Sequence, residues 1–442
     1  MSLLLYDPAP LRLLSSAFRT EAQRSLPQLY TVLELTAPSG TVRLAPASVA
    51  STVGGQYSAR IVSSGAAVQA IDLSSPRLND MTVSVSIADT DRTFAKLHAT
   101  YRNTLRGSAV KMRVLSDNVP DADSMTCFVG LLDSYQMTGE SQWELSLRTD
   151  DIALANTDIP RVAINRGDWP NAHADALGLA APIVYGEHDS VDLSNKGMVP
   201  CYCVDTVAFK YAVSLGLMRA IRAVYKDGVK QTTGWSATFE TVSGRTWTII
   251  DFTSTMGDAA ITADVEGLSS VYDGSGDLIS NPARQIEHLL RCFVWDNWSS
   301  GAYPTATKID PASFALVCDT LAARGHRGGL RLGGTRERAM VVLERWCQTF
   351  GVYPYWTYAG TIGLGMLDWA PPATYPDFLL PETACRALAL PFDASQLTRE
   401  IALRYCYDSA VEQYMFDRKV QDLSVSERTS VSREMRDARA AV

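Results

Sequence analysis

Residues 81–87 constrain the fold most, because apolar and hydroxyl-bearing side chains alternate there without a break, as Met-Thr-Val-Ser-Val-Ser-Ile. Successive side chains of a strand point to opposite faces, so this pattern predicts a strand with one buried and one polar face. Similar runs occupy residues 30–35, 41–44, 109–115, 126–132 and 142–147. We therefore expect residues 26–155 to form one antiparallel sheet closed into a barrel or sandwich, within a β-barrel domain of residues 26–175.

The length of 442 residues exceeds what one hydrophobic core usually spans, so several domains are expected. Residues 1–25 are expected to form an N-terminal arm, with a short helix as the alternative for residues 11–24. A passage rich in Gly, Ala and Pro at residues 177–186 is typical of a linker with a buried segment and predicts a boundary. Residues 176–275 then form a smaller β-rich insertion, in which Asp227-Gly228 predicts a hairpin turn.

Residues 276–390 differ in kind, because their apolar side chains recur at helical spacing. Asn281-Pro282 and Asp310-Pro311 each supply a capping residue followed by proline, which favours two helix starts. A third helix is expected at residues 336–350, ending at Gly351, before short strands at residues 353–357 and 361–367. Residues 391–442 add a C-terminal β segment, at residues 400–407 and 412–416, and a polar tail. The fold class is therefore α+β and multidomain, with a barrel, a β insertion and an α+β domain.

The net charge of the chain argues against a nucleic-acid-binding protein. The 40 Lys and Arg residues are outnumbered by 48 Asp and Glu residues, for a formal net charge of -8, whereas phosphate binding normally needs a basic excess. A hydrophobic content of 46% is enough for a folded core. Residues 1–8 do not resemble a signal peptide, and no apolar run approaches the roughly 18–20 residues that span a bilayer, so we expect no membrane segment.

The eight cysteines are interpreted as reduced and mostly buried thiols. The close pair Cys201 and Cys203 leaves one alternative open, half of a metal site completed by His or Asp residues from elsewhere.

Signs of catalytic or nucleotide-binding chemistry are weak. None of the five histidines belongs to a metalloprotease or serine-hydrolase motif; His188 lies among acidic residues, for which a solvated loop is the favoured explanation. Residues 325–334 are rich in Gly but lack the Gly-Lys-Ser/Thr ending of a phosphate loop, so a flexible connection between helices is expected. Asp89 and Asp91 resemble the start of a calcium loop, but no Gly and Glu follow at the required spacing, and a helix start explains them better.

Two aromatic clusters, at residues 295–298 and 353–358, have the composition of a carbohydrate platform. Each follows a predicted helix that must be packed, so we expect core and interface roles. We therefore assign no catalytic, cofactor-binding or metal-binding residue and expect neither a cofactor nor an enzyme.

Several segments, in their order, resemble the hub core of the lambda-type host-specificity (tail tip) protein family of tailed bacteriophages. They are Asn281-Pro-Ala-Arg-Gln-Ile-Glu-His-Leu-Leu290, Ile309-Asp-Pro-Ala-Ser-Phe314, Leu343-Glu-Arg-Trp-Cys-Gln-Thr-Phe350 and Tyr355-Trp-Thr-Tyr-Ala-Gly-Thr-Ile-Gly-Leu364, with Ala181-Pro-Ile-Val-Tyr-Gly186 before them and Glu400-Ile-Ala-Leu-Arg-Tyr-Cys-Tyr-Asp408 after them.

The resemblance implies a homotrimeric hub in the virion, made in the host cytoplasm, whose barrel domains continue or close the tail tube. Its implied partners are the distal tail protein, the tape-measure protein and a fibre or needle protein. DNA would pass through the bore without specific binding. Three copies carry three times -8, or -24, and an acidic wall would repel DNA phosphates. The alternative function is a tail-associated hydrolase of cell-wall or surface polysaccharide, which needs two carboxylates at a separation that sequence cannot show.

Overall fold

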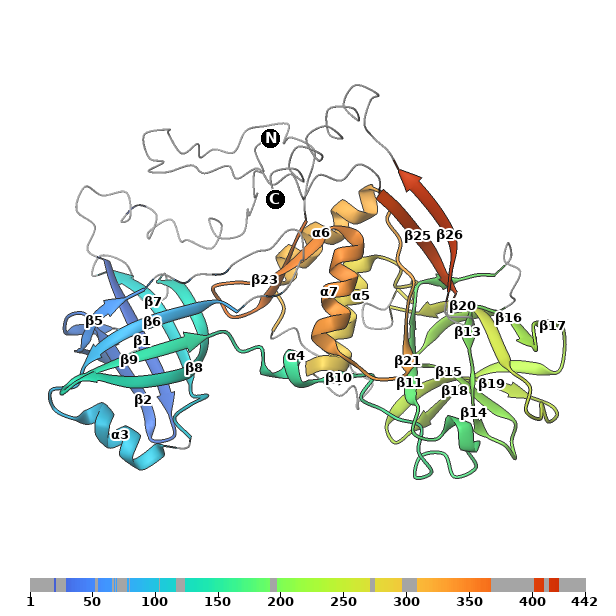
Figure 1. The fold of residues 1–442 in the computed structure, drawn as a ribbon, viewed down its shortest axis with the longest axis horizontal. Helices are drawn as coiled ribbons and strands as arrows, with labels where there is room; N and C mark the ends of the chain where they lie inside the picture. Colours follow the sequence, from blue (N-terminus) through green and yellow to red (C-terminus); the bar gives the residue numbers. More distant parts are fainter. Residues whose placement is uncertain are drawn as a thin grey trace, which may run out of the picture.

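A nine-stranded sheet forms one end of the molecule, at the left of Figure 1. The computed structural model describes residues 20, 29–51, 55–65, 67, 69, 78, 80–102, 104–116, 124–190, 197–270, 275–295, 308–366, 401–408 and 413–420. The strand order is β3-β4-β2-β1-β7-β8-β9-β6-β5. The strands are β1 (Leu29–Ala37), β2 (Gly40–Ala45), β3 (Val49–Ser51), β4 (Gly55–Ala59), β5 (Ile61–Ser64), β6 (Thr82–Ala88), β7 (Ala109–Ser116), β8 (Met125–Gly139) and β9 (Gln142–Arg148).

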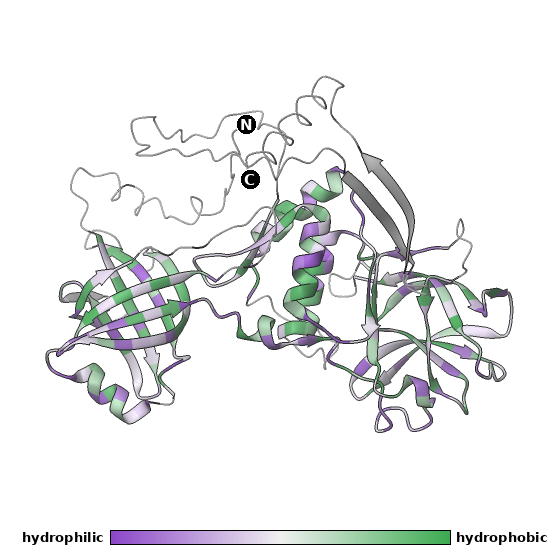
Figure 2. Cartoon of the chain, in the orientation of Figure 1, coloured by the Kyte–Doolittle hydropathy of each residue, from purple (hydrophilic) through white to green (hydrophobic). Residues whose placement is uncertain are grey.

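Alternation of side chains builds this sheet as the sequence predicts. Val83, Val85 and Ile87 of β6 are buried, whereas Thr82 and Ser84 are exposed. Figure 2 shows the same mixture of hydrophobic and hydrophilic residues across the neighbouring strands. The core therefore lies on one face of a curved sheet, and the six strands expected in this region are confirmed.

The expected barrel closure is not confirmed as a strand ladder among the described residues, since the strand order has two ends. The two sides nevertheless meet at Arg60, between β4 and β5. Its backbone N–H donates to the Ala45 carbonyl of β2 at 2.8 Å, and its carbonyl accepts from the Ala88 N–H of β6 at 2.7 Å. One chain segment thus contacts both sides of the sheet.

Helices occupy the middle of the molecule (Figure 1). They are α4 (Ile152–Asn156), α5 (Pro282–Leu289), which continues as the π-helix η3 (Leu290–Trp295), α6 (Pro311–Ala323) and α7 (Ala339–Phe350); α3 (Thr93–Tyr101) lies on the nine-stranded sheet. The side chain of Asn281 caps α5 by accepting from the Ala283 N–H, and Asp310 caps α6 through the Ser313 N–H. Gly351 ends α7 at a φ of 64°. These three boundary residues are the ones that the sequence predicts.

Short strands connect the helices to the rest of the chain. The hairpin of β23 (Val352–Trp356) and β24 (Ile362–Met366) follows α7, and β10 (Asp158–Ile159) pairs with β22 (Glu337–Arg338). The predicted linker contains a fully buried strand, β11 (Ala180–Tyr185), which pairs with β21 (Leu330–Gly334). The expected boundary near residue 176 stays a prediction.

Two smaller sheets form the β-rich unit at the right of Figure 1. One has the order β12-β20-β16-β17, with β13 also on β20, and the other has the order β14-β15-β19-β18. An apolar core that includes Val213, Ile250 and Val265 lies between them. Their elements are β12 (Glu187–His188), β13 (Val199–Pro200), β14 (Tyr202–Asp205), β15 (Lys210–Leu215), β16 (Met218–Lys226), β17 (Val229–Gln231), β18 (Trp235–Val242), β19 (Arg245–Phe252) and β20 (Ile261–Leu268), preceded by the 3-10 helix η2 (Ala174–Ala176).

The Asp227-Gly228 hairpin joins β16 to β17 as predicted, with positive φ values of 50° and 76°. Near the C-terminus, β25 (Ile401–Asp408) and β26 (Gln413–Val420) form the expected β segment. The N-terminal arm, the helix predicted at residues 11–24 and the polar tail lie outside the described residues, apart from residue 20. None of the helices in the described ranges is both long and apolar enough to cross a membrane.

Candidate functional site

The cysteine pair is split between two environments. Cys201 is buried and its Sγ lies 3.5 Å from the Val199 carbonyl oxygen, whereas Cys203 is only half-buried. Burial raises the pKa of Cys201 to about 12, so it is held as a neutral thiol. In the part of the chain that the structure describes, no group of three or more His, Cys, Asp or Glu side chains could hold a metal ion.

The prediction of free, mostly buried thiols is confirmed for the described cysteines. All six are free, and Cys201, Cys292, Cys318 and Cys347 are buried. Cys385 and the side chain of Cys406 lie outside the described residues.

His188 is not in a solvated loop, and that prediction is wrong. It belongs to β12 and is only 6% exposed, while its acidic neighbours Glu187 and Asp189 are exposed. The alternation of a strand explains the difference, because neighbours in sequence point to opposite faces. His188 Nε2 donates to the Tyr185 carbonyl oxygen at 3.1 Å.

The glycine-rich residues 325–334 are not simply a flexible connection, since they include the paired strand β21. Gly325 ends α6 at a φ of 70°. A Cβ at Gly328 would lie 2.7 Å from the Trp346 ring. Close packing therefore accounts for glycine there without a bound phosphate.

Asp89 and Asp91 do begin a helix. The carboxylate of Asp89 accepts from the N–H groups of Phe94 and Ala95, each at 2.8 Å, and Asp91 accepts from Thr93 N–H at 3.1 Å. This confirms the helix-start interpretation, because such bonds satisfy the free N–H groups of the first turn.

The second aromatic cluster is largely core, as predicted. Tyr353 and Trp356 are buried, while Tyr358 at the hairpin turn is 37% exposed. Trp295 packs partly buried against the main core, and Trp298 lies outside the described residues.

The β-rich unit and the helical part of the chain meet at a closely packed joint. We define the glycine joint as Gly186, Gly267 and Gly328, where three backbone segments meet. A Cβ at Gly186, whose φ is 75°, would lie 1.9 Å from the Gly328 carbonyl oxygen. A Cβ at Gly267 would lie 2.5 Å from the Val184 carbonyl oxygen, and the Gly267 N–H donates to the Gly186 carbonyl at 2.8 Å. No other residue type fits these contacts without displacing backbone.

Two buried histidines flank this joint and share Tyr185. The Tyr185 hydroxyl lies 2.7 Å from His288 Nδ1 on α5, and its carbonyl accepts from His188. His288 Nε2 lies 3.6 Å from the Cys292 Sγ. Burial lowers the pKa of His188 to about 4 and that of His288 to about 3, so both rings are neutral at pH 7.

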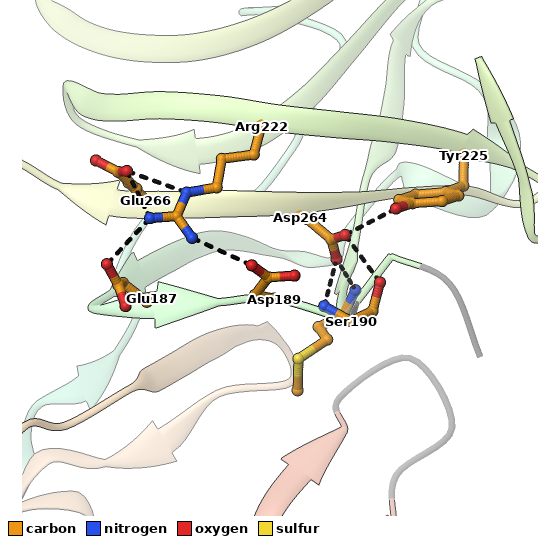
Figure 3. Close-up of polar contacts among 8 residues, drawn as sticks. Glu187, Asp189, Ser190, Arg222, Tyr225, Asp264 and Glu266 are labelled. Carbon is orange, nitrogen blue, oxygen red and sulfur yellow. Dashed lines mark hydrogen bonds and ion pairs between the residues drawn. The ribbon is translucent and has the colours of Figure 1, made fainter. Parts of the chain in front are cut away.

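Outside the joint, Arg222 connects three strands (Figure 3). It occupies a bulge in β16, between Ile221 and Ala223. Its guanidinium donates to Glu266 at 2.7 Å, to Glu187 at 3.1 Å and to Asp189 at 3.2 Å. The hydrogen bond that Arg222 donates to Glu266 is the largest cause of the raised pKa of Arg222.

Asp264 organises the neighbouring buried side of the same sheet (Figure 3). Its carboxylate accepts from the hydroxyl of Ser190 at 2.8 Å, the hydroxyl of Tyr225 at 2.9 Å and the Ser190 N–H at 3.1 Å. A buried carboxylate needs such donors, since an unsatisfied charge is costly to bury. The two networks hold β12, β16 and β20 together from both faces.

Sequence reasoning locates none of these joint contacts. The only local signal is the Tyr-Gly-Glu-His run at residues 185–188, and His288 lies about a hundred residues away. The arrangement is suited to mechanical coupling, because its polar groups are engaged with one another.

Comparison with solved structures finds several chains that are similar to this one. No protein-family model matches the chain, and no curated protein matches it. A chain from a solved structure described as the virion of a native gene transfer agent (GTA) particle is similar to it, with a TM-score of 0.28 and 13% sequence identity. The match covers 57% of this chain and 86% of that chain.

Proposed function

We propose that this protein is a structural hub of a phage-type tail tip or baseplate, without catalytic activity. Three copies form a ring that continues or closes the tail tube and joins the distal tail ring to a central fibre, and DNA passes through the bore. The protein belongs to the virion in this proposal, and its partners are the distal tail, tape-measure and fibre or needle proteins. The order of the segments that resemble the tail tip family is the sequence support.

The observation that carries the proposal is the curvature of the nine-stranded sheet. Residue 60 bonds through its backbone to both β2 and β6, and its guanidinium pairs with Asp91 and lies 3.5 Å from Asp89. A sheet whose sides meet in this way supports a barrel, which hides strand edges and suits a tube wall.

The joint gives the second support. Direct backbone contact at the glycine joint couples the β-rich unit to the helices, and a ring component that bears load between a tube and a fibre needs such coupling. The carboxylates of Glu187, Asp189 and Glu266 are all ion-paired with Arg222.

The mass of the purified full chain in solution tests the proposal. Analytical ultracentrifugation should give a trimer, alone or on addition of the distal tail protein. A strict monomer under both conditions contradicts it. Clearing of host cell walls by the purified chain would instead favour the hydrolase, and tight retention of duplex DNA at 150 mM salt would contradict an inert bore.

A further inference from the structure

The contacts of Tyr185 join two elements that are far apart in sequence. Through its carbonyl it holds His188 on β12, and through its hydroxyl it holds His288 on α5. The side chains of Tyr185, His188 and His288 are 0%, 6% and 3% exposed. Tyr185 therefore links β11 to the helical layer through the buried His288 ring, and the buried His188 ring closes a local contact at the end of β11.

The groups that face His188 come from four elements. Tyr185 lies on β11, Asp264 on β20 and Arg331 on β21, while Glu187 and Asp189 beside it on the chain point to Arg222. The carboxylate of Asp264 already accepts from Ser190 and Tyr225. A charge on His188 would thus lie near the cation Arg331 and near a carboxylate committed to other donors.

His288 faces a similar set of groups. Arg284, Glu287 and Arg291 lie on its own helix and the following turn, and Tyr185 and Cys292 contact its ring. The carboxylate of Glu287 is paired with Arg291 at 2.5 Å and with Arg284 at 3.4 Å. A second cation at His288 would be repelled by Arg291.

The backbone beside the histidines is closely packed at the glycine joint. The glycine joint holds residues 186, 267 and 328 in direct contact, and His188 lies against Gly329, whose added Cβ would be 3.6 Å from the ring. The cost of a buried imidazolium would therefore be relieved by separation of the elements, because close packing opposes rearrangement within them.

We propose that the buried rings of His188 and His288 form an acid-sensitive latch at the contact of β11 with α5, and that protonation of either imidazole opens this contact while the nine-stranded sheet stays folded. This inference is independent of the tail-tip function. The released state is a local opening, in which both rings reach water and regain ordinary basicity.

Hydrogen exchange of the full chain, read by mass spectrometry between pH 7 and 4.5 and corrected for the intrinsic pH dependence of exchange, tests the latch. Peptides from β11, β12 and α5 should open more often as the pH falls, by up to about tenfold per pH unit for each histidine below about 6.5. Peptides from β6 and β9 should keep their protection. The proposal would be overturned if the β6 and β9 peptides lost protection at the same pH as the β11, β12 and α5 peptides and with the same dependence on pH.

The variant His288→Gln removes one titrating ring. The opening of the β11, β12 and α5 peptides should then rise less steeply as the pH falls, by up to about tenfold less per pH unit. His173→Gln is the matched control, because His173 is 39% exposed, and it should leave the pH profile unchanged. If His288→Gln does not fold, ring-carbon NMR of the wild-type chain still decides. Two of the five histidines should stay neutral at pH 5, and titration of all five between pH 6 and 7 would refute the latch.

Discussion

Replacing Gly186 by alanine should weaken the joint far more than the same change at Gly228, and the two form a matched pair. Their φ values are 75° and 76°, so both replacements carry the left-handed backbone cost of about 1–2 kcal/mol. They differ in their surroundings. A Cβ at Gly228 meets nothing within 4 Å, whereas a Cβ at Gly186 would lie 1.9 Å from the Gly328 carbonyl oxygen.

Relief of that contact requires the backbones at residues 186 and 328 to move apart by more than 1 Å. Overpacking of this kind costs about 1–3 kcal/mol, and loss of the 2.8 Å bond from Gly267 N–H to the Gly186 carbonyl adds about 1 kcal/mol. Gly186→Ala should therefore destabilise the joint by about 2–4 kcal/mol more than Gly228→Ala.

Thiol labelling of Cys292 under native conditions measures this difference. Cys292 is 1% exposed, so it reacts only when the joint opens, and mass spectrometry separates it from the other cysteines. A difference of 2–4 kcal/mol corresponds to labelling about 30- to 1,000-fold faster in Gly186→Ala than in Gly228→Ala. Equal labelling rates would refute the close-contact explanation and leave only the φ cost that the two sites share.

Three further predictions concern polar contacts. Arg113→Ala should lower the free energy of unfolding by about 3–5 kcal/mol in urea titrations, because it leaves Glu34 and Tyr57 without their buried cation; a loss below 1 kcal/mol would argue against a buried pair. Burial alone would raise the pKa of Glu34, but hydrogen bonds from Tyr57 and Arg113 leave it lowered. The stabilisation by Glu34 is therefore present above about pH 4.5 and is lost as the pH falls further. Glu34→Gln should weaken the dependence of the free energy of unfolding on pH below about pH 4.5, and an unchanged dependence contradicts this. Arg222→Gln should lower the free energy of unfolding by no more than about 1 kcal/mol, because exposed ion pairs contribute little. Asp89→Ala should lower it by about 0.5–2 kcal/mol, because the cap of α3 is lost. Circular dichroism melts of the two variants compare these losses.

Boundaries of helices and hairpins could be predicted because they depend on neighbouring residues. Asn281 and Asp310 cap their helices with their own side chains, and Asp227-Gly228 supplies the two positive φ values of a tight hairpin. Each of these features is complete within a few residues of chain, so the sequence pattern contains the information.

His188 shows where local reasoning fails. Its acidic neighbours suggest a solvated loop, but β12 pairs with β20, and the strand turns His188 inward while Glu187 faces Arg222. Nothing between residues 185 and 190 specifies that pairing. The same holds for Gly328, whose lack of a side chain matters only because Trp346 and Gln285 lie against it.

The sequence by itself determined six strands of the nine-stranded sheet, the three main helices and the acidic charge, since periodicity, capping and composition are local properties. The tertiary structure decided which buried groups meet, because the sheet edges approach at Arg60 and the joint forms at Gly186 only through contacts with distant segments. Such contacts depend on how separate elements pack to bury their apolar faces, and this packing is a property of the whole chain.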